Sequence, residues 1–337
     1  MSHWKGKYGP YLIAEIGGNH EGDFKYAQLL TQLACESGVD AVKLQIYTGD
    51  TIANKLVDPQ RNEHFKKFEL SQDQYKNLFQ ICQRYGVECT ASVWDPDALT
   101  WVDPFVEFFK IGSGDLTAYP ILKSIAKYDK PCLLSTGLAT IDEIEGAVAL
   151  MQSVNPMYSE SSSLAILQCT SMYPIPDEDA NLNVMNSLRS RFSHPVGYSD
   201  HTIGSLAVEV AVAMGAEIIE MHFTDSRDGK SFRDHKVSFT KDEIKSLIER
   251  IIKIKELQGD SNKEPTKSEI EAGHVASFRR AVYPNRSIAA GEILAEDDLI
   301  TLRPNKGIDA RDAQKLIGKT VGTNLKQFQE LGYEYFE

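Results

Sequence analysis

The sequence predicts a (β/α)8 barrel followed by a small C-terminal domain rich in β structure. Short apolar, β-favouring runs alternate with longer segments of helical periodicity through roughly the first 225 residues. These runs are almost continuously apolar, which is typical of parallel strands covered on both faces. Eight such units fit the ~250 residues of a closed barrel better than they fit an open, doubly wound sheet.

The eight predicted strands are spaced along the whole barrel segment. They are expected at residues 11–16, 41–46, 87–92, 108–111, 132–135, 164–169, 196–199 and 217–223. Helices are predicted between them. The first covers residues 24–37 and has Ala27, Leu30, Leu33 and Ala34 on one face. The last covers residues 241–257 and carries apolar residues at helical spacing from Ile244 onward.

The composition changes after Leu257. Residues 258–276 are rich in Gly, Lys, Glu, Ser and Pro, which indicates a linker. A compact segment then shows short β-like pieces at 280–283 and 299–302 and a helix near 310–316. The predicted organisation is therefore a barrel at 1–257, a linker at 258–276 and a C-terminal domain at 277–337. Because about sixty residues form a marginal domain alone, we expect this domain to pack on the barrel or on a neighbouring subunit.

The bulk properties exclude several classes of protein. The chain has 337 residues and a formal net charge of −12, which argues against general nucleic-acid binding but not against an anionic substrate in a locally basic cleft. Its five cysteines are an odd number without a Cys-x-x-Cys pair, and we expect reduced core thiols. Neither a signal peptide nor an apolar segment long enough to cross a bilayer is present, so a cytoplasmic protein without membrane contact is expected.

Two histidines end apolar strands that are predicted to be neighbours. His201 follows the seventh run and His222 lies in the eighth. Neutral imidazole is a common ligand of divalent transition metals, and two protein ligands would leave positions open for water and substrate. This pattern predicts a catalytic metal site, the alternative being two satisfied core histidines. His20 is expected at the rim of the site. His3, His64, His194, His235 and His274 are expected on the surface or in loops.

Lysines and serines at other strand ends suggest a site for an anion. Lys43, Lys110, Ser113 and Ser135 are expected to surround it, because Gly next to Ser lets backbone amides approach phosphate oxygens while ammonium groups neutralise the charge. Polar strand ends are common in any barrel, but a lysine within an apolar strand is costly to bury unpaired. Glu15 and Glu220 lie on apolar strands as well. They are candidates for proton transfer or for binding sugar hydroxyls, and the alternative for Glu15 is a charge pair with Lys43 or Lys110.

The motifs that contain these residues resemble those of the sialic acid (N-acetylneuraminate) synthase family, which includes legionaminic and pseudaminic acid synthases. The resemblance covers nearly the whole chain and is carried by residues 13–22, 109–115, 133–137, 168–174, 197–202 and 220–224. Residues 288–302, followed by Arg303-Pro304, resemble the small antifreeze-like (SAF) domain that ends members of this family. The resemblance implies a TIM barrel with a C-terminal antifreeze-like domain.

The resemblance also implies a reaction. Phosphoenolpyruvate would condense with an N-acyl aldose, such as N-acetylmannosamine or a 2,4-diacetamido hexose, with C–O bond cleavage and release of phosphate. A divalent metal, typically Mn²⁺ with Mg²⁺ or Co²⁺ as alternatives, would bind His201 and His222, which with Glu15 and Glu220 form the expected catalytic set. The residues matching the phosphoenolpyruvate site are Lys43, Ser92, Lys110, Ser113, Ser135 and Ser199. Those matching the acceptor site are Tyr173, Asp234 and Arg303, the arginine being offered to the partner's site across a domain-swapped homodimer.

Three departures from the family pattern bear on the acceptor sugar. Ser171 stands where Asn is usual, Arg233 replaces a proline before Asp234, and Asn305 replaces a glycine in the tail. Arg233 is either a solvated side chain or a contact to an acceptor that bears an extra acidic or polar group. Two rival functions remain open: a related phosphoenolpyruvate-dependent synthase for a different aldose, and a non-catalytic carbohydrate-binding protein. The antifreeze-like tail argues against the first, and the retained histidines and lysines argue against the second.

Overall fold

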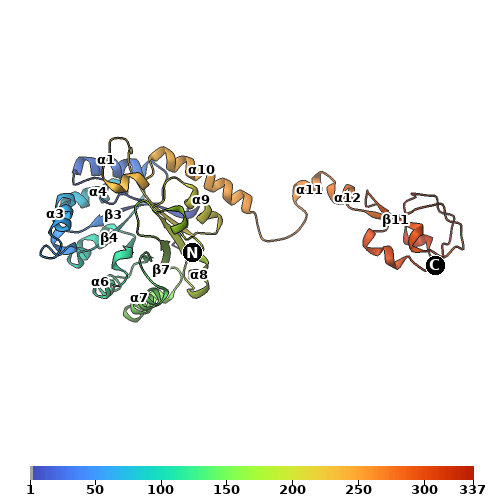
Figure 1. Cartoon of the computed structure of the whole chain (residues 1–337), viewed down its shortest axis with the longest axis horizontal. Helices are drawn as coiled ribbons and strands as arrows, with labels where there is room; N and C mark the ends of the chain where they lie inside the picture. The colour runs from blue at the N-terminus through green and yellow to red at the C-terminus, as the bar shows by residue number, and fades with distance from the viewer. Residues whose placement is uncertain (1–2) are drawn as a thin grey trace. The chain divides into compact units, whose positions relative to one another are not determined.

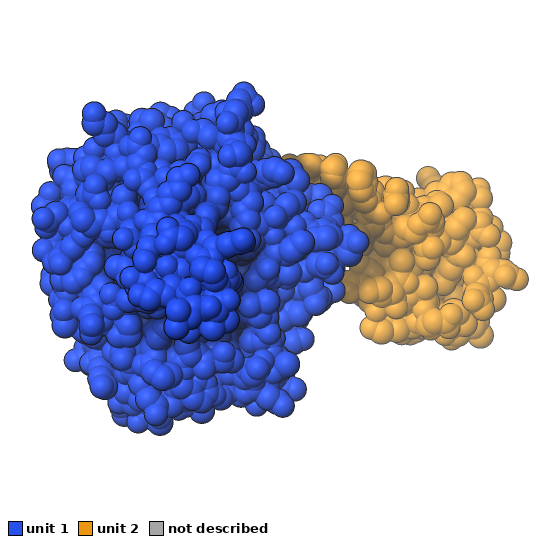
Figure 2. All heavy atoms as spheres, turned by 60° about the vertical axis from the view of Figure 1, so that its left-hand side comes forward, with its two compact units in different colours: residues 1–259 blue, residues 260–337 orange. Residues whose placement is uncertain are grey.

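A computed structural model describes residues 3–337 of the chain and divides it into two compact units. The first ends at Gly259 and the second runs from Asp260 to Glu337 (Figures 1 and 2).

Parallel strands form a closed barrel in the first unit, as predicted. Each strand pairs with the next, and β9 closes the ring by pairing with β2. The strands are β2 (Gly9–Glu15), β3 (Ala41–Ile46), β4 (Glu88–Val93), β5 (Phe108–Ile111), β6 (Cys132–Ser135), β7 (Leu164–Cys169), β8 (Val196–Asp200) and β9 (Ile218–His222). A short β1 (Lys5–Gly6) pairs antiparallel with β2. All eight predicted barrel strands are confirmed, with boundaries that differ by at most two residues.

Helices surround this barrel (Figure 1). They are α1 (Phe24–Cys35), α2 (Gly49–Ile52), α3 (Pro59–Phe68), α4 (Gln72–Tyr85), α5 (Leu99–Val102), α6 (Tyr119–Ile125), α7 (Ile141–Val154), α8 (Val184–Arg191), α9 (Leu206–Ala213) and α10 (Lys241–Gln258). The start of α10 is fixed by a capping box in which the Thr240 hydroxyl accepts from the Glu243 N–H while the Glu243 carboxylate accepts from the Thr240 N–H. Two extra helices, α2 and α3, stand between β3 and α4, where a simple repeat needs only one helix.

The inside of the barrel changes from apolar to polar along the strands. Near the amino ends a buried cluster fills it: Trp4, Tyr11, Ile13, Ala41, Phe108, Leu133, Ala165, Leu167 and Ile218. Side chains two residues apart point to the same face of a strand. Glu15 therefore faces inward like Ile13, Lys43 like Ala41 and Lys110 like Phe108. The next inward layer toward the carboxyl ends is consequently charged.

The second unit is small and has its own core. It contains α11 (Lys267–Glu271), α12 (His274–Ser277) and an antiparallel pair, β10 (Ala281–Pro284) and β11 (Leu299–Leu302). The helix predicted near residue 310 is a 3-10 segment, Ala310–Lys315. The core of the second unit consists of Val282, Ile288, Leu294, Ile308, Leu316, Val321, Leu325 and Leu331.

The structure also bears on the cysteines and on membrane-spanning helices. The five cysteines are buried and unpaired, as expected of core thiols. Within residues 3–337 no helix combines the length and the apolar character needed to cross a membrane.

Candidate active site

A cavity of about 1060 Å³ opens at the carboxyl ends of the barrel strands. All predicted catalytic, phosphoenolpyruvate and acceptor residues of the barrel line it: Glu15, Lys43, Ser92, Lys110, Ser113, Ser135, Tyr173, Ser199, His201, Glu220, His222 and Asp234. The structure therefore brings these residues together, while their individual roles stay predictions.

A buried lysine between two carboxylates forms the floor of the cavity. Lys43 Nζ lies 2.7 Å from Glu15 Oε2 and 2.9 Å from Glu220 Oε1. Glu15 also accepts a hydrogen bond of 2.7 Å from Gln45 Nε2, and Glu220 accepts one of 3.1 Å from the Ser199 hydroxyl. The charge pair between Glu15 and Lys43, considered as an alternative to a catalytic role, is thus present. It does not exclude that role, because both groups still face the cavity.

Lys110 and the serines form a second polar group on the wall. Lys110 Nζ donates to Ser135 Oγ at 2.7 Å and to the Ile111 carbonyl at 2.9 Å, and lies 4.0 Å from Glu220 Oε1. Across the next loop, the Gly137 N–H donates to Ser113 Oγ at 3.0 Å. These hydroxyl, amide and ammonium groups are the donors that an anion requires.

The charges on the floor follow from burial and mutual attraction. Burial lowers the pKa of Lys43 to about 8, even though Glu220 opposes the shift. Burial alone would raise the pKa of Glu220, but the ammonium groups of Lys110 and Lys43 outweigh it and lower that pKa to about 2. Glu220 is therefore ionised at neutral pH, and Lys43 is still largely protonated. Such perturbed groups gathered in a cleft are typical of functional sites.

The two predicted histidines face each other beside this floor. Their ring centroids are 5.1 Å apart, and the Tyr173 ring lies 4.1 Å from that of His201 and 5.6 Å from that of His222. His201 Nδ1 is 2.8 Å from the Thr170 carbonyl oxygen, so Nδ1 carries the proton and Nε2 presents a lone pair. Burial lowers the pKa of both imidazoles. Both are therefore neutral, as metal ligands must be.

This pair fits a divalent metal with open coordination positions. His222 Nδ1 is buried and has no hydrogen-bond partner among residues 3–337. In the part of the chain that the structure describes, no cluster of three or more His, Cys, Asp or Glu side chains suitable for a metal occurs. A metal held by two imidazoles alone would leave room for substrate and water, which a catalytic site needs and a structural site does not.

Some expectations about single residues were wrong. Lys43 is not at the end of its strand but in the middle of β3, and it reaches the cavity because its side chain points into the barrel. His20 does not line the cavity. It is buried, its Nδ1 accepts a 3.1 Å hydrogen bond from the Gly22 N–H, and burial lowers its pKa to about 4.

Three further histidines were expected on the surface or in loops. His64 is exposed, as expected, and it also lines the cavity. His194 lies in the loop between α8 and β8, as expected, but it is buried, as is His235. Their ring nitrogens lie 2.9 Å from the Tyr158 carbonyl oxygen and 2.8 Å from the Thr224 hydroxyl, respectively. The alternative of satisfied core histidines, considered for the pair on the strands, applies to these two.

Sequence reasoning missed the part of the wall that α3 supplies. Arg61, His64, Phe65 and Phe68 line the cavity from this helix, and Phe232 lines it from the loop after β9. A usable signal was the interval between predicted strands at 46 and 87, which is longer than one connecting helix needs. Asp115 was also missed: it lines the cavity, and burial raises its pKa to about 6 although Lys110 opposes this.

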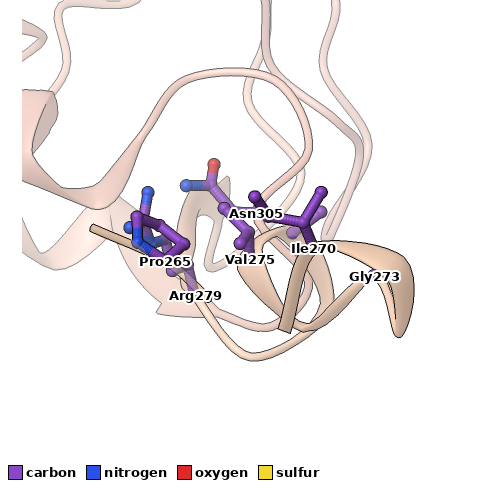
Figure 3. A pocket seen from close by; sticks show the side chains of 7 residues that line it. Pro265, Ile270, Gly273, Val275, Arg279 and Asn305 are labelled. Atoms are coloured by element: carbon purple, nitrogen blue, oxygen red, sulfur yellow. The ribbon is translucent and has the colours of Figure 1, made fainter. Parts of the chain in front are cut away.

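Arg303 and Asn305 belong to the second unit. The Arg303 guanidinium lies 5.4 Å from the centre of the Phe278 ring. Asn305 lines a separate shallow cavity of about 510 Å³, with Ile270 and Val275 among its neighbours (Figure 3). Its side chain donates to Asp309 Oδ2 at 2.7 Å, which gives this departure from the family pattern a local structural role.

Comparison with known proteins decides the family. Residues 30–263 match the NeuB family and residues 279–327 match the SAF domain. The chain belongs to the NeuB family. It is 34% identical to the N,N'-diacetyllegionaminic acid synthase of Legionella pneumophila over 97% of this chain and 94% of that protein. It is 32% identical to the N-acetylneuraminate-9-phosphate synthase of Mus musculus, over 96% and 92% of the two chains.

A solved structure agrees with this assignment. The N-acetylneuraminic acid synthetase of Leptospira borgpetersenii, in complex with citrate, superposes with a TM-score of 0.72 at 30% identity. The match covers 78% of this chain and 90% of that one. The barrel followed by an antifreeze-like domain, expected from the sequence motifs, is thus confirmed.

Proposed function

We propose that this NeuB-family protein is a nonulosonic acid synthase that condenses phosphoenolpyruvate with an N-acyl aldose. C3 of phosphoenolpyruvate bonds to the sugar aldehyde carbon, water adds at C2, and phosphate leaves with cleavage of its C–O bond. The products are a 2-keto-3-deoxy sugar acid and inorganic phosphate. The observation that carries the proposal is that the two lysines and the two imidazoles meet in one cavity.

The lysine and serine groups are suited to the phosphoenolpyruvate. Lys110, Ser135 and Ser113 offer donors on one wall, close to the amide of Gly137. Lys43 is already paired with two carboxylates, so it neutralises less of the charge on a bound anion than Lys110 does, and it helps to hold the two carboxylates in position. Ser92 and Ser199 complete the lining. An anion bound there would keep its phosphate at the wall and its enol carbon toward Glu15 and Glu220.

Those two carboxylates are the candidates for proton transfer. Glu220 is ionised and accepts hydrogen bonds from Lys43 and Ser199, so it can orient a water molecule, while its pKa of about 2 makes it a weaker base than an ordinary carboxylate. Glu15 lies opposite both Lys43 and His222 in the sheet, between the two predicted substrate sites. A divalent metal bound by His201 and His222, most simply Mn²⁺, would supply Lewis acidity toward the sugar aldehyde.

We further propose that the protein works as a domain-swapped homodimer in which Arg303 of one copy serves the acceptor site of the other. Two observations support this: Arg303 is exposed, and the residues that line the active-site cavity all belong to the first unit.

The test is phosphate release from phosphoenolpyruvate in the presence of Mn²⁺ and a panel of acceptors. The panel contains N-acetylmannosamine, its 6-phosphate, a 2,4-diacetamido hexose and an unacylated pentose phosphate, which with the three carbons of phosphoenolpyruvate would give an octulosonate. Turnover with an N-acyl hexose supports the proposal. Turnover with the unacylated sugar phosphate alone would contradict it, and so would the absence of turnover with every acceptor in the panel.

A further inference from the structure

A second group of cations lies in the active-site cavity, away from the buried lysines. Arg61 of α3 and Arg233 of the loop after β9 both line it, and both are exposed. The two elements are joined by aromatic contacts. The Phe232 ring lies 5.9 Å from that of His64 and 5.0 Å from that of Phe68. The elements that carry the two arginines are therefore in contact beside the cavity.

Both arginines lie close enough to His64 to affect its pKa. Burial lowers its pKa, and the charges of Arg233, Lys67 and Arg61 lower it further. Two carboxylates, Asp58 and Asp234, line the same part of the cavity. Asp234 lies 3.2 Å from Arg233 Nε, and Asp58 is engaged by the Arg61 backbone N–H at 3.0 Å.

The arginines still have donors to offer, unlike the lysines on the floor. Arg233 uses its Nε toward Asp234, and its Cζ lies 4.6 Å from the centre of the Tyr173 ring. Its terminal amino groups have no hydrogen-bond partner within residues 3–337. The Arg61 guanidinium makes no ion pair in the same range, and its Cζ lies 5.8 Å from the centre of the Phe65 ring. Two guanidinium groups with free donors in one concave edge are suited to bidentate binding of an oxyanion.

The position of Tyr173 sets the direction of the acceptor. Its ring centre lies 4.1 Å from that of His201 and 4.6 Å from Arg233 Cζ, so Tyr173 contacts both the imidazole pair and an arginine. A sugar whose aldehyde lies at the imidazole pair would therefore extend past Tyr173 toward the arginines.

We propose that the acceptor sugar carries a negatively charged substituent, a phosphate or a carboxylate, at the end remote from its aldehyde, and that Arg61 and Arg233 bind it. This inference rests on the proposed synthase function and names its substrate class.

The experiment compares kcat/KM for three acceptors that differ only at C6: N-acetylmannosamine, its 6-phosphate and the corresponding uronic acid. The wild-type protein should prefer one anionic acceptor over the neutral sugar by at least about tenfold, the effect of a single charge-assisted hydrogen bond. Arg61→Gln and Arg233→Gln should each reduce this preference about tenfold, mainly through KM for the anionic acceptor. Arg84→Gln is the matched control, because Arg84 lies in the last turn of α4 and does not line the cavity. It should leave the preference unchanged.

The outcomes separate this inference from the proposed function. A preference for the 6-phosphate or for the uronic acid identifies which anion is bound. Turnover with the neutral sugar that equals or exceeds both anionic acceptors overturns the inference and leaves the synthase function standing. An anionic preference that survives in both arginine variants also overturns it. If no acceptor is turned over, the synthase function is overturned, and this inference with it.

Discussion

Lys43→Met tests whether the charges on the floor of the cavity are as tightly coupled as their distances indicate. The ammonium group is buried between two carboxylates, at 2.7 Å from Glu15 and 2.9 Å from Glu220. Without it Glu220 keeps Lys110 at 4.0 Å, whereas Glu15 keeps only the neutral amide of Gln45. One uncompensated buried carboxylate remains, so we expect a loss of about 3 kcal/mol, the lower end of the range for a broken buried ion pair.

Adding Glu15→Gln to Lys43→Met tests whether the uncompensated Glu15 charge causes this loss of stability. In the double variant the uncompensated charge is gone, so the loss should fall to about 1 kcal/mol, the scale of one hydrogen bond. Urea unfolding followed by tryptophan fluorescence measures this in the barrel alone, because all three tryptophans lie in the first unit. A Lys43→Met variant that loses under about 1 kcal/mol would refute the argument. So would a double variant less stable than Lys43→Met alone.

Three further predictions concern binding. A Cβ on Gly137 would come within 2.5 Å of Ser171 Oγ and 2.8 Å of Ser113 Oγ, so Gly137→Ala should raise KM for phosphoenolpyruvate about tenfold in steady-state assays. Gly114→Ala, with nothing within 4 Å, is its control and should not. Mn²⁺ at about 100 times its Kd should stabilise the wild type by ~2.7 kcal/mol in urea unfolding, and His222→Ala should abolish this gain because one of two imidazole ligands is lost. Arg303→Ala should raise the acceptor KM far more than KM for phosphoenolpyruvate, because only the acceptor is expected to contact it.

Each of these has an outcome that contradicts it. Equal KM values in the two glycine variants would mean that the serine hydroxyls simply move aside. Full Mn²⁺ stabilisation of His222→Ala would place the ion elsewhere. Equal effects of Arg303→Ala on both substrates would argue against an arm that reaches the acceptor.

The barrel could be predicted from the sequence because its signals are local. An apolar run such as 132–135 is long enough to be one buried strand, and the helix after it begins at a capping box formed by Thr140 and Glu143. The C-terminal unit was harder to predict in detail. Most of its segments are short, and its 3-10 segment at 310–315 has the composition of a short helix but not the hydrogen bonds of one.

The candidate site could be predicted where a polar residue interrupts an apolar strand. Lys43, Lys110 and Glu220 were found in this way. The wall supplied by α3 could not, because Arg61 and His64 lie on a largely exposed helix whose pattern is that of any solvated surface. Whether such a helix faces water or a cavity depends on where the long connection after β3 folds back, which no local pattern reports. The same limit explains His235, whose buried setting depends on a contact with Thr224 eleven residues earlier.

The closure of the barrel is what joins the two halves of the site. In the register of the sheet Glu15 is opposite Lys43 on one side and His222 on the other, because β2 pairs with both β3 and β9. The lysine and the imidazole are 179 positions apart in sequence numbering, from 43 to 222, yet a single residue separates them across the strands. In an open sheet β2 and β9 would lie far apart, and Lys43 would not come near His222. Glu15 is therefore the residue at which the two predicted substrate sites touch, and a substitution there should disturb both KM values, whereas Gly137→Ala or Arg303→Ala should disturb one.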